Sequence, residues 1–187
     1  MKDILILYYS KNDSTKRLAR VIARGIESVA DTSAVIRTVK SYHYKDNDDL
    51  LVSKQDLKSC SGMILGSPTH FGNMAAPLKE FLDSTTEEWL NNTLENKLGG
   101  VFTSTSSLHG GQETTLLSMM LPLLHHGMIL AGVPYSEKAL TSTTSGGTPY
   151  GPSHVSHNQK SELTEEEKQI CLTYGKRFAN IIKNMNS

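Results

Sequence analysis

The stretch from Gly62 to Asp83 constrains the fold of this 187-residue chain more than any other. It opens with an apolar run at positions 63–65, whose length and flanks are typical of a buried strand. We expect Gly66–Pro68 to end that strand, because proline has no amide hydrogen to give to a β-ladder. From Leu78 to Asp83 the apolar residues recur at helical spacing, and Pro77 stands near the helix start. Strand, polar loop and helix form one α/β unit, and in open α/β sheets ligands bind outside the carboxyl ends of the strands.

A second α/β unit opens the chain. The continuous apolar run Ile4–Tyr9 is typical of a central parallel strand that is buried on both faces, and the apolar stripe at positions 18, 21, 22, 26 and 29 predicts a helix. The turn Ser10–Thr15 between them is rich in hydroxyl groups. Such a turn can aim backbone amides and the helix dipole at a phosphate. Alternatively, Asp13 or Ser14 is the N-cap of the helix, and the two roles can coexist.

The remaining elements follow from periodicity and capping signals. Strands are predicted over Ala34–Val39, Lys97–Thr103 and Met128–Val133, and a short helix over Val52–Leu57. Further helices are predicted over Gln112–His126, which Pro122 should kink or divide, and after the capping box Thr164–Glu167. The segments 41–56 and 135–159 are expected to be irregular; the acidic cluster 46–49 lacks the spacing of a calcium loop, so we interpret it as a solvated connection. Five strands alternating with helices predict a doubly wound α/β sheet in a single domain, 1–187.

Composition limits the classes of partner. Nineteen basic and nineteen acidic side chains give a net charge of +0, so no broad attraction to nucleic acid or an anionic membrane is expected. Cys60 and Cys171 belong to no CxxC or metal-spaced pattern and are interpreted as packed thiols, and no metal site is predicted. The apolar run 4–9 is too short for a signal peptide or a membrane span. We therefore expect a soluble, cytoplasmic protein.

Several strings closely resemble the flavodoxin-like NAD(P)H:quinone oxidoreductases, the tryptophan-repressor-binding-protein family. They are SPTHFGNM followed by LKEFLD within 67–83, GGQET at 110–114, HHGM at 125–128 and GGTPYG at 146–151. The resemblance implies a flavodoxin-like, five-stranded parallel sheet of order 2-1-3-4-5, with FMN bound where the strand order switches between strands 1 and 3. It also implies NAD(P)H as co-substrate and a quinone as electron acceptor.

The resemblance implies that three loops bind FMN. Two residues depart from the family pattern: Asp13 replaces a glycine, and Asn12 replaces an aromatic residue that faces the nicotinamide. Aspartate tolerates the left-handed backbone that such a turn requires better than most residues. The implied cofactor-binding residues are Ser10, Asn12, Asp13, Ser14 and Thr15 in the first loop, Pro68, Thr69, His70, Phe71, Gly72 and Asn73 in the second, and Ser104, Thr105, Ser106, Ser107, Leu108, Gly110 and Gly111 in the third, which is about one residue longer than the common form.

Two further residues are candidates for the reacting face. The family resemblance implies that His125 is catalytic and approaches the flavin from a neighbouring subunit. On the residues alone, a histidine pair before a strand could instead serve packing or capping. For Trp89, the only tryptophan, two interpretations stay open: a packing residue at the surface, or an aromatic lid that binds substrate at the mouth of the flavin pocket.

The apolar side chains within 119–124 exceed one buried stripe, which favours a subunit contact. We expect a homotetramer, with dimers possible.

The expected activity is that of an FMN-dependent oxidoreductase, which takes a hydride from NAD(P)H and passes two electrons to a quinone. One alternative is a flavodoxin-like one-electron carrier, but such carriers usually present an acidic docking face, and this chain has no net charge. The other is a regulatory or interaction protein that binds flavin without turnover, which the departures at Asn12 and Asp13 would permit.

Overall fold

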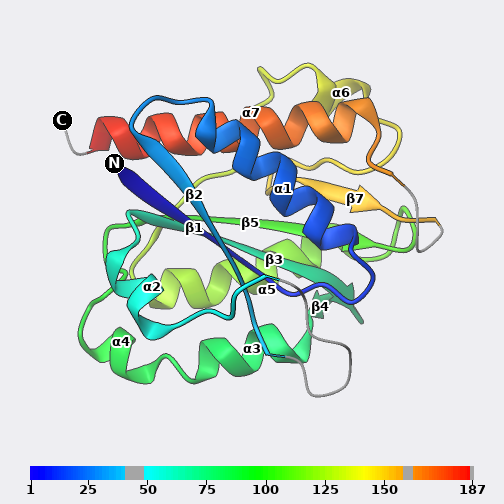
Figure 1. Cartoon of the computed structure of the whole chain (residues 1–187). Helices are drawn as coiled ribbons and strands as arrows, with labels where there is room; N and C mark the ends of the chain where they lie inside the picture. Colours follow the sequence, from blue (N-terminus) through cyan, green and yellow to red (C-terminus); the bar gives the residue numbers. More distant parts are fainter. Residues whose placement is uncertain (41–48, 158–161, 186–187) are drawn as a thin grey trace.

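A computed structural model of the chain describes residues 1–40, 49–157 and 162–185. Within these ranges, strands and helices alternate along most of the chain (Figure 1). Their order is β1 (Lys2–Tyr8), α1 (Ser14–Glu27), β2 (Thr32–Thr38), α2 (Lys54–Ser59), β3 (Gly62–His70), β4 (Asn73–Met74), α3 (Ala76–Asp83), α4 (Thr86–Leu90), β5 (Leu98–Thr105), α5 (Gln112–His125), β6 (Ile129–Leu130), α6 (Ala139–Ser142), β7 (Ser153–Val155) and α7 (Glu165–Met185).

The sheet has the order β2-β1-β3-β5-β6, and all neighbours on this path are parallel. The predicted doubly wound arrangement is therefore present, but the prediction of five strands was wrong, because the described residues form a sheet of seven. The additional strands are β4, which pairs antiparallel with β3, and β7, which pairs parallel with β5. Two short strands share the side of β5 that faces away from β3: β6 pairs with Leu98 and Gly99, whereas β7 pairs with Thr103–Thr105. This division explains why the fifth predicted strand, 128–133, shrinks to two residues.

Strand β3 also corrects the sequence prediction, because it continues through Pro68 to His70. The carbonyl oxygen of Gly66 accepts a hydrogen bond from the amide of Tyr9 at 2.9 Å, so the backbone polar groups of Gly66 point toward β1. Residues two apart along a strand direct their backbone polar groups to the same side, so Pro68 also faces the β1 side. There β1 has already ended, and the missing amide hydrogen of Pro68 removes no ladder hydrogen bond.

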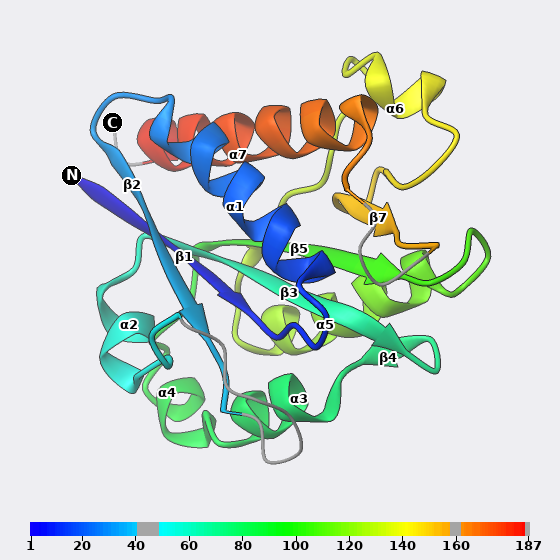
Figure 2. The ribbon, with the colours of Figure 1, turned by 45° about the vertical axis from the view of Figure 1, so that its right-hand side comes forward.

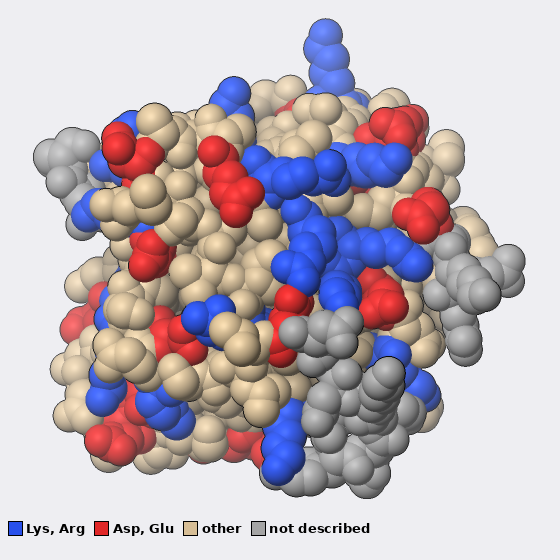
Figure 3. Space-filling view, viewed as in Figure 1, with Lys and Arg blue, Asp and Glu red and all other residues tan. Residues whose placement is uncertain are grey.

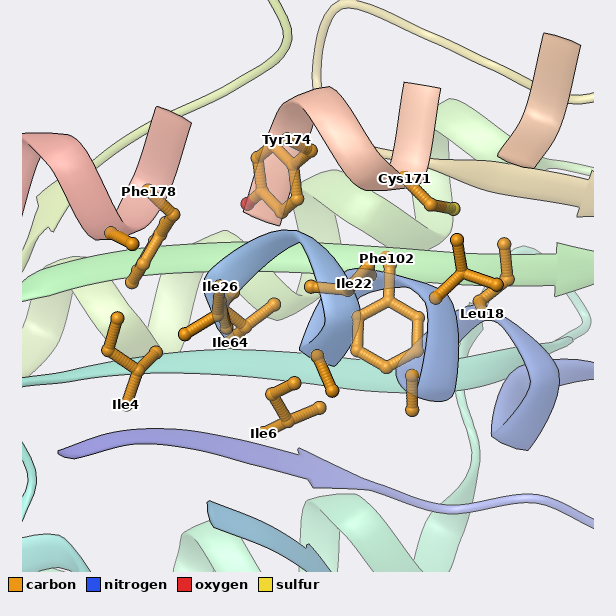
Figure 4. Packing of buried hydrophobic residues seen from close by; sticks show 14 of the residues in the cluster. Ile4, Ile6, Leu18, Ile22, Ile26, Ile64, Phe102, Cys171, Tyr174 and Phe178 are labelled. Atoms are coloured by element: carbon orange, nitrogen blue, oxygen red, sulfur yellow. The ribbon is translucent and has the colours of Figure 1, made fainter. Parts of the chain in front are cut away.

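Helices cover both faces of the sheet, as Figure 1 shows. Helices α1 and α7 lie on one face, and α2, α3, α4 and α5 lie on the other. Alternation along β1 separates the two cores: Ile4 and Ile6 pack beneath α1 and α7, whereas Leu5 and Leu7 pack against the opposite helices. Figure 4 shows the first core, in which side chains of α1 and α7 pack together with strand side chains on one face of the sheet.

The helices largely follow the predicted patterns. The stripe that begins at Leu18 is buried on α1, and α5 is one helix that Pro122 does not divide. The capping box is confirmed: the Thr164 amide donates to Glu167 Oε2 at 2.9 Å, and the Glu167 amide donates to Thr164 Oγ1 at 3.2 Å. The irregular segment 135–159 contains α6 and β7, which were not predicted. Of the acidic cluster, residues 46–48 lie outside the described part of the chain.

No helix in the described ranges has both the length and the apolar character needed to cross a membrane. In the same ranges, no group of three or more histidine, cysteine or acidic side chains is placed to hold a metal ion.

Candidate functional site

A cavity of about 360 Å³ lies at the carboxyl edge of the sheet, where β1, β3 and β5 end. These strands run toward the same edge in Figure 2, beside the start of α1. The volume falls within the range of about 300–1,000 Å³ that is usual for cofactor and small-molecule sites. The cavity is lined by Lys11, Asn12, Ser14, Pro68, Thr69, His70, Ser104, Thr105, Ser106, Ser156 and His157.

The loop after β1 leads into the first turn of α1. Asp13 adopts the left-handed conformation, with φ of 62°, as its place in the turn predicted. It occupies the N-cap position, yet its carboxylate makes no capping hydrogen bond. Ser10 Oγ lies 3.4 Å from the amide nitrogen of Lys16, a long hydrogen bond. Asp13 thus supplies no side-chain cap, and the amides at the start of α1 can bind an anion together with the Ser14 hydroxyl.

Thr15 anchors this loop to the sheet rather than lining the cavity itself. Its side chain is completely buried, and its Oγ1 lies 2.9 Å from Ser104 Oγ at the end of β5. Ser104 does line the cavity. A hydrogen bond between the first and third predicted loops thus fixes the start of α1 against one cavity wall.

The second predicted loop is the end of β3 and a tight hairpin. Phe71 and Gly72 form its two-residue turn with φ of 55° and 76°, and β4 follows at once. Only Pro68, Thr69 and His70 line the cavity, while Phe71 is fully exposed at the tip. Thr115 Oγ1 on α5 lies 3.0 Å from Thr69 Oγ1, and this hydroxyl–hydroxyl hydrogen bond holds this side of the cavity against the helix.

The third loop contributes through its first residues. Ser104, Thr105 and Ser106 line the cavity, whereas the other predicted residues, Ser107, Leu108, Gly110 and Gly111, do not. The Ser107 carbonyl accepts hydrogen bonds from Thr105 Oγ1 at 2.8 Å and from the Gly110 amide at 3.2 Å, so the loop folds back on itself. Gly111 then caps α5 with φ of 90°, a conformation that favours glycine.

The electrostatics of the site favour an anion. Among the described residues that line the cavity, none is acidic, and Lys11 is basic. Burial lowers the pKa of His70, and the charge of Lys11 lowers it further, so the free site favours the neutral form of His70. Figure 3 shows lysine and arginine gathering over α1, which carries Lys16, Arg17, Arg20 and Arg24. Arg17 and Arg20 pair with Glu162 and Asp49, so this local positive charge is partly balanced.

Sequence reasoning missed three cavity residues. Lys11 lies within the predicted phosphate loop, and its basic side chain was a signal that could have found it. Ser156 and His157 follow β7 and reach the cavity because β7 pairs with β5. No local pattern predicts that pairing, since β7 has only three residues.

His125 and Trp89 lie together in a different place. Both line a groove of about 350 Å³ between α3, α4 and the end of α5, and the indole Nε1 of Trp89 donates to the His125 carbonyl at 2.8 Å. Neither residue lines the cavity at the sheet edge. Within a single chain, Trp89 therefore does not lie at the mouth of the flavin cavity, where one of the two interpretations of the sequence placed it. A role of either residue toward a cofactor stays a prediction that requires a second subunit.

The residues present fit FMN. A phosphate matches the amides and hydroxyl at the start of α1, together with Lys11. Ser104 and Ser106 offer hydroxyls to the polar edge of a ring, and Pro68 offers an apolar surface. The donor set is thus that of a site for a phosphorylated, partly polar, ring-shaped molecule.

Comparison with known proteins agrees with this geometry. The family model described as NADPH-dependent FMN reductase matches residues 3–139. A protein of Chromohalobacter salexigens named NAD(P)H dehydrogenase (quinone) is 39% identical over 195 residues, which cover 97% of this chain and 97% of that protein. A protein of Solidesulfovibrio magneticus with the same name is 32% identical over 203 residues, with coverage of 99% and 100%.

Solved structures show the same fold. The flavodoxin, WrbA-like protein from Agrobacterium tumefaciens superposes with a TM-score of 0.73 at 22% identity, covering 98% of this chain and 99% of that chain. Flavodoxin 1 from Bacillus cereus superposes with a TM-score of 0.64 at 16% identity, covering 96% and 98%. The flavodoxin-like α/β fold with a parallel sheet is confirmed.

Proposed function

Because the chain belongs to the NAD(P)H dehydrogenase (quinone) family, we propose that it is an FMN-dependent oxidoreductase that takes a hydride from NAD(P)H and reduces a quinone by two electrons. The observation that carries this proposal is the convergence of the α1 N-terminus with the ends of β1, β3 and β5 on one cavity that is rich in hydroxyls and free of lining acids in the described residues. When bound, FMN supplies the hydride-accepting chemistry.

The protein's own residues bind and orient the cofactor in this proposal. The first-turn amides of α1, Ser14 and Lys11 hold the phosphate. Ser104 and Ser106 donate hydrogen bonds to the polar edge of the ring. The free site favours the neutral form of His70 because burial lowers its pKa, and negative charge nearby would favour its protonated form. The other loop residues predicted from the sequence, such as Ser10 and Gly111, act by fixing the loops.

The proposal includes a homotetramer, in exchange with dimers. Trp89 and His125 do not line the cavity of their own chain, which supports a contact with the flavin of a neighbouring subunit. Leu121 and Leu124, on α5 beside this groove, are 60% and 53% exposed, which supports a subunit contact there. A four-subunit assembly is commonly of dihedral symmetry.

We further propose that residues 1–187 act as one FMN-binding domain in the cytoplasm. Cys60 and Cys171 are both free and buried. Unpaired thiols of this kind suit a reducing compartment, which supports the proposed location.

Two measurements test the activity. Purified protein is titrated with FMN, and NADH or NADPH oxidation is then followed with benzoquinone as acceptor. We expect FMN binding and two-electron quinone reduction with saturable dependence on both substrates. Binding of FMN without oxidation of either nicotinamide would overturn the enzyme proposal and favour a carrier or a regulatory flavoprotein. Absence of FMN binding would overturn the cofactor proposal as well.

The shared pocket is tested by mixing two variants. Thr15→Val chains have a defective phosphate loop, and His125→Ala chains lack the histidine. If neighbouring subunits complete each site, mixed assemblies contain some sites with both features intact, and quinone reductase activity is partly restored. Sedimentation that detects only monomers at micromolar protein with FMN bound would contradict the assembly.

A further inference from the structure

The side-chain amide of Gln112, at the start of α5, joins two parts of the chain that are far apart in the sequence. Gln112 is 4% exposed. Its Oε1 accepts a hydrogen bond from Ser153 Oγ on β7, and its Nε2 donates to Thr105 Oγ1 at the end of β5, at 3.2 Å. Both bonds are buried, so loss of either would leave a polar atom without water as a substitute.

These two bonds are the centre of a longer hydrogen-bond chain with one direction. The amide of Gly147 donates to Ser153 Oγ at 2.7 Å, and Ser153 in turn donates to Gln112. At the other end, Thr105 Oγ1 accepts from Gln112 and donates to the Ser107 carbonyl at 2.8 Å. Each hydroxyl has one hydrogen, so each can donate only once. The middle position therefore needs an acceptor and a donor on one planar group, which glutamine supplies and glutamate or methionine does not.

This hydrogen-bond chain connects the segments that form two walls of the cofactor cavity. Thr105 lines the cavity directly, and Ser156 and His157 line it immediately after β7. Strand β7 pairs with β5 through three residue pairs, Thr103–Thr105 with Ser153–Val155. The ladder is flanked by bonds from the Thr103 amide to the Pro152 carbonyl at 3.0 Å and from the Ser156 amide to the Thr105 carbonyl at 2.8 Å. A ladder this short defines the position of the wall only weakly by itself.

We propose that Gln112 is a positioning residue for the cofactor: by tying β7 to the end of β5, it holds the walls that contain Thr105, Ser106, Ser156 and His157 in their binding arrangement before the cofactor enters. This inference rests on the proposed binding of FMN. Gln112 does not line the cavity and need not touch FMN. It acts by lowering the entropy that the loops would otherwise lose when the ligand binds.

The test compares Gln112→Met with Gln112→Glu in FMN titrations. Methionine keeps the length and volume of the side chain but has no amide, and glutamate keeps the acceptor for Ser153 but loses the donor for Thr105. The matched control is Gln169→Met on α7, at an exposed glutamine whose side chain bonds to Thr173 and Glu137 instead. We expect the FMN dissociation constant to rise at least tenfold in both Gln112 variants and to stay within twofold in the control.

Hydrogen exchange separates positioning from simple stabilisation. At a temperature well below every melting temperature, the amides of 105–107 and 153–157 should exchange faster in FMN-free Gln112→Met than in the wild type, while the amides of α7 remain protected. A dissociation constant within twofold of the wild type, with unchanged exchange, would overturn the inference even if the melting temperature falls. If the wild type itself binds no FMN, the proposed function fails instead.

A milder variant keeps the inference testable if Gln112→Met does not fold. Ser153→Ala removes one hydroxyl from the chain and leaves Thr105 in place. We expect at least a threefold rise in the FMN dissociation constant, and a Ser153→Ala effect that adds less than fully to Gln112→Glu, because both changes break the same hydrogen-bond chain. Unchanged binding in Ser153→Ala would count against the inference.

Discussion

The hydroxyl group of Tyr174 donates a hydrogen bond to the carbonyl oxygen of Ala131 at 3.1 Å. The same hydroxyl accepts a hydrogen bond from the Val101 amide, also at 3.1 Å. These backbone groups lie where β6 has left β5 and β7 has not yet begun to pair. Tyr174 on α7 thus supplies the hydrogen-bond partners that these two backbone groups would otherwise find in a neighbouring strand. Gly100 makes room for the tyrosine side chain, because a Cβ at position 100 would lie 2.0 Å from the hydroxyl oxygen.

Removal of this hydroxyl should destabilise the fold. Tyr174→Phe leaves the Val101 amide and the Ala131 carbonyl buried without this partner, so we expect the free energy of unfolding to fall by about 1–3 kcal/mol. Urea denaturation measures the change. The control is Tyr135→Phe, since Tyr135 is 67% exposed and its hydroxyl can bond to water. Equal midpoints for Tyr174→Phe and the wild type would show that the bridge contributes no net stability.

The crossing of α1 and α7 predicts a second effect on stability. A Cβ at Gly175 would lie 2.2 Å from the Ile22 carbonyl oxygen, and a Cβ at Gly25 would lie 2.3 Å from that of Leu172. Gly175→Ala must therefore push the helices apart, and we expect a loss of about 1–3 kcal/mol in the free energy of unfolding, despite the higher helix propensity of alanine. The matched substitution Asn180→Ala, at an exposed position of α7, should be neutral or slightly stabilising. A stabilised Gly175→Ala would contradict the close approach.

The buried carboxylate of Glu167 predicts a pH dependence. Burial alone would raise its pKa, but the hydrogen bond and charge of His154 and the amides of Thr164 and Gly146 together hold the pKa below its ordinary value. A carboxyl group with a lowered pKa in the folded state contributes stability that is present above its unfolded pKa, about 4.3, and is lost as the pH falls through the folded value. Acid unfolding should therefore steepen below about pH 4.3.

Glu167→Gln tests that contribution. A glutamine cannot replace both acceptor oxygens, so we expect a loss of about 1–3 kcal/mol at pH 7 and a flatter stability curve at acid pH than in the wild type. Urea titrations at several pH values measure both. Glu165→Gln on the same helix, at a side chain that is 86% exposed, is the control and should leave the curve unchanged. Parallel curves for Glu167→Gln and the wild type would assign the acid sensitivity to other groups.

The sequence predicted those elements whose pattern is local. The apolar run of β1 and the stripe of α1 need no tertiary information, because each pattern already defines a buried face. The continuation of β3 through Pro68 could not be predicted from a local pattern. Whether a proline ends a strand depends on whether a neighbour needs its amide, and here the neighbour β1 ends at Tyr8. Strands β4 and β7 are too short to show an alternation, so their pairing is decided by the turn at Phe71–Gly72 and by side chains of α5 and α7.

The candidate site likewise contains residues that local strings in the sequence identified and residues that only tertiary packing brings there. Its loops after β1, β3 and β5 carry strings that resemble a known family, and Asn12, Thr69 and Ser104 do line the cavity. Ser156 and His157 were missed because they reach the cavity through β7, which is docked by the buried Gln112 and Glu167. The separation of Trp89 from the cavity was also missed, since it depends on where α4 packs rather than on any neighbour in the sequence.

The phosphate loop yields a prediction about cofactor affinity. Asp13 holds a left-handed backbone conformation that glycine adopts at lower cost, and its negative charge lies beside the proposed phosphate position. Asp13→Gly removes the charge and the backbone strain, and we expect FMN to bind about 3- to 30-fold more tightly, which corresponds to about 0.6–2 kcal/mol. Thr15→Val should act in the opposite direction by about 1–3 kcal/mol, because it breaks the bond to Ser104 that fixes the loop.

Asp31→Gly provides the matched control for the effect of charge. Asp31 also has a left-handed backbone, with φ of 65°, but it lies in the turn between α1 and β2, at the opposite end of α1 from the cavity. Both glycine variants relieve a similar backbone strain, whereas only Asp13→Gly removes a negative charge near the phosphate. Fluorescence titration with FMN should therefore show tighter binding for Asp13→Gly and an unchanged dissociation constant for Asp31→Gly. Weaker binding in Asp13→Gly would mean that the carboxylate stabilises the loop in its binding conformation, and the repulsion argument would then be wrong.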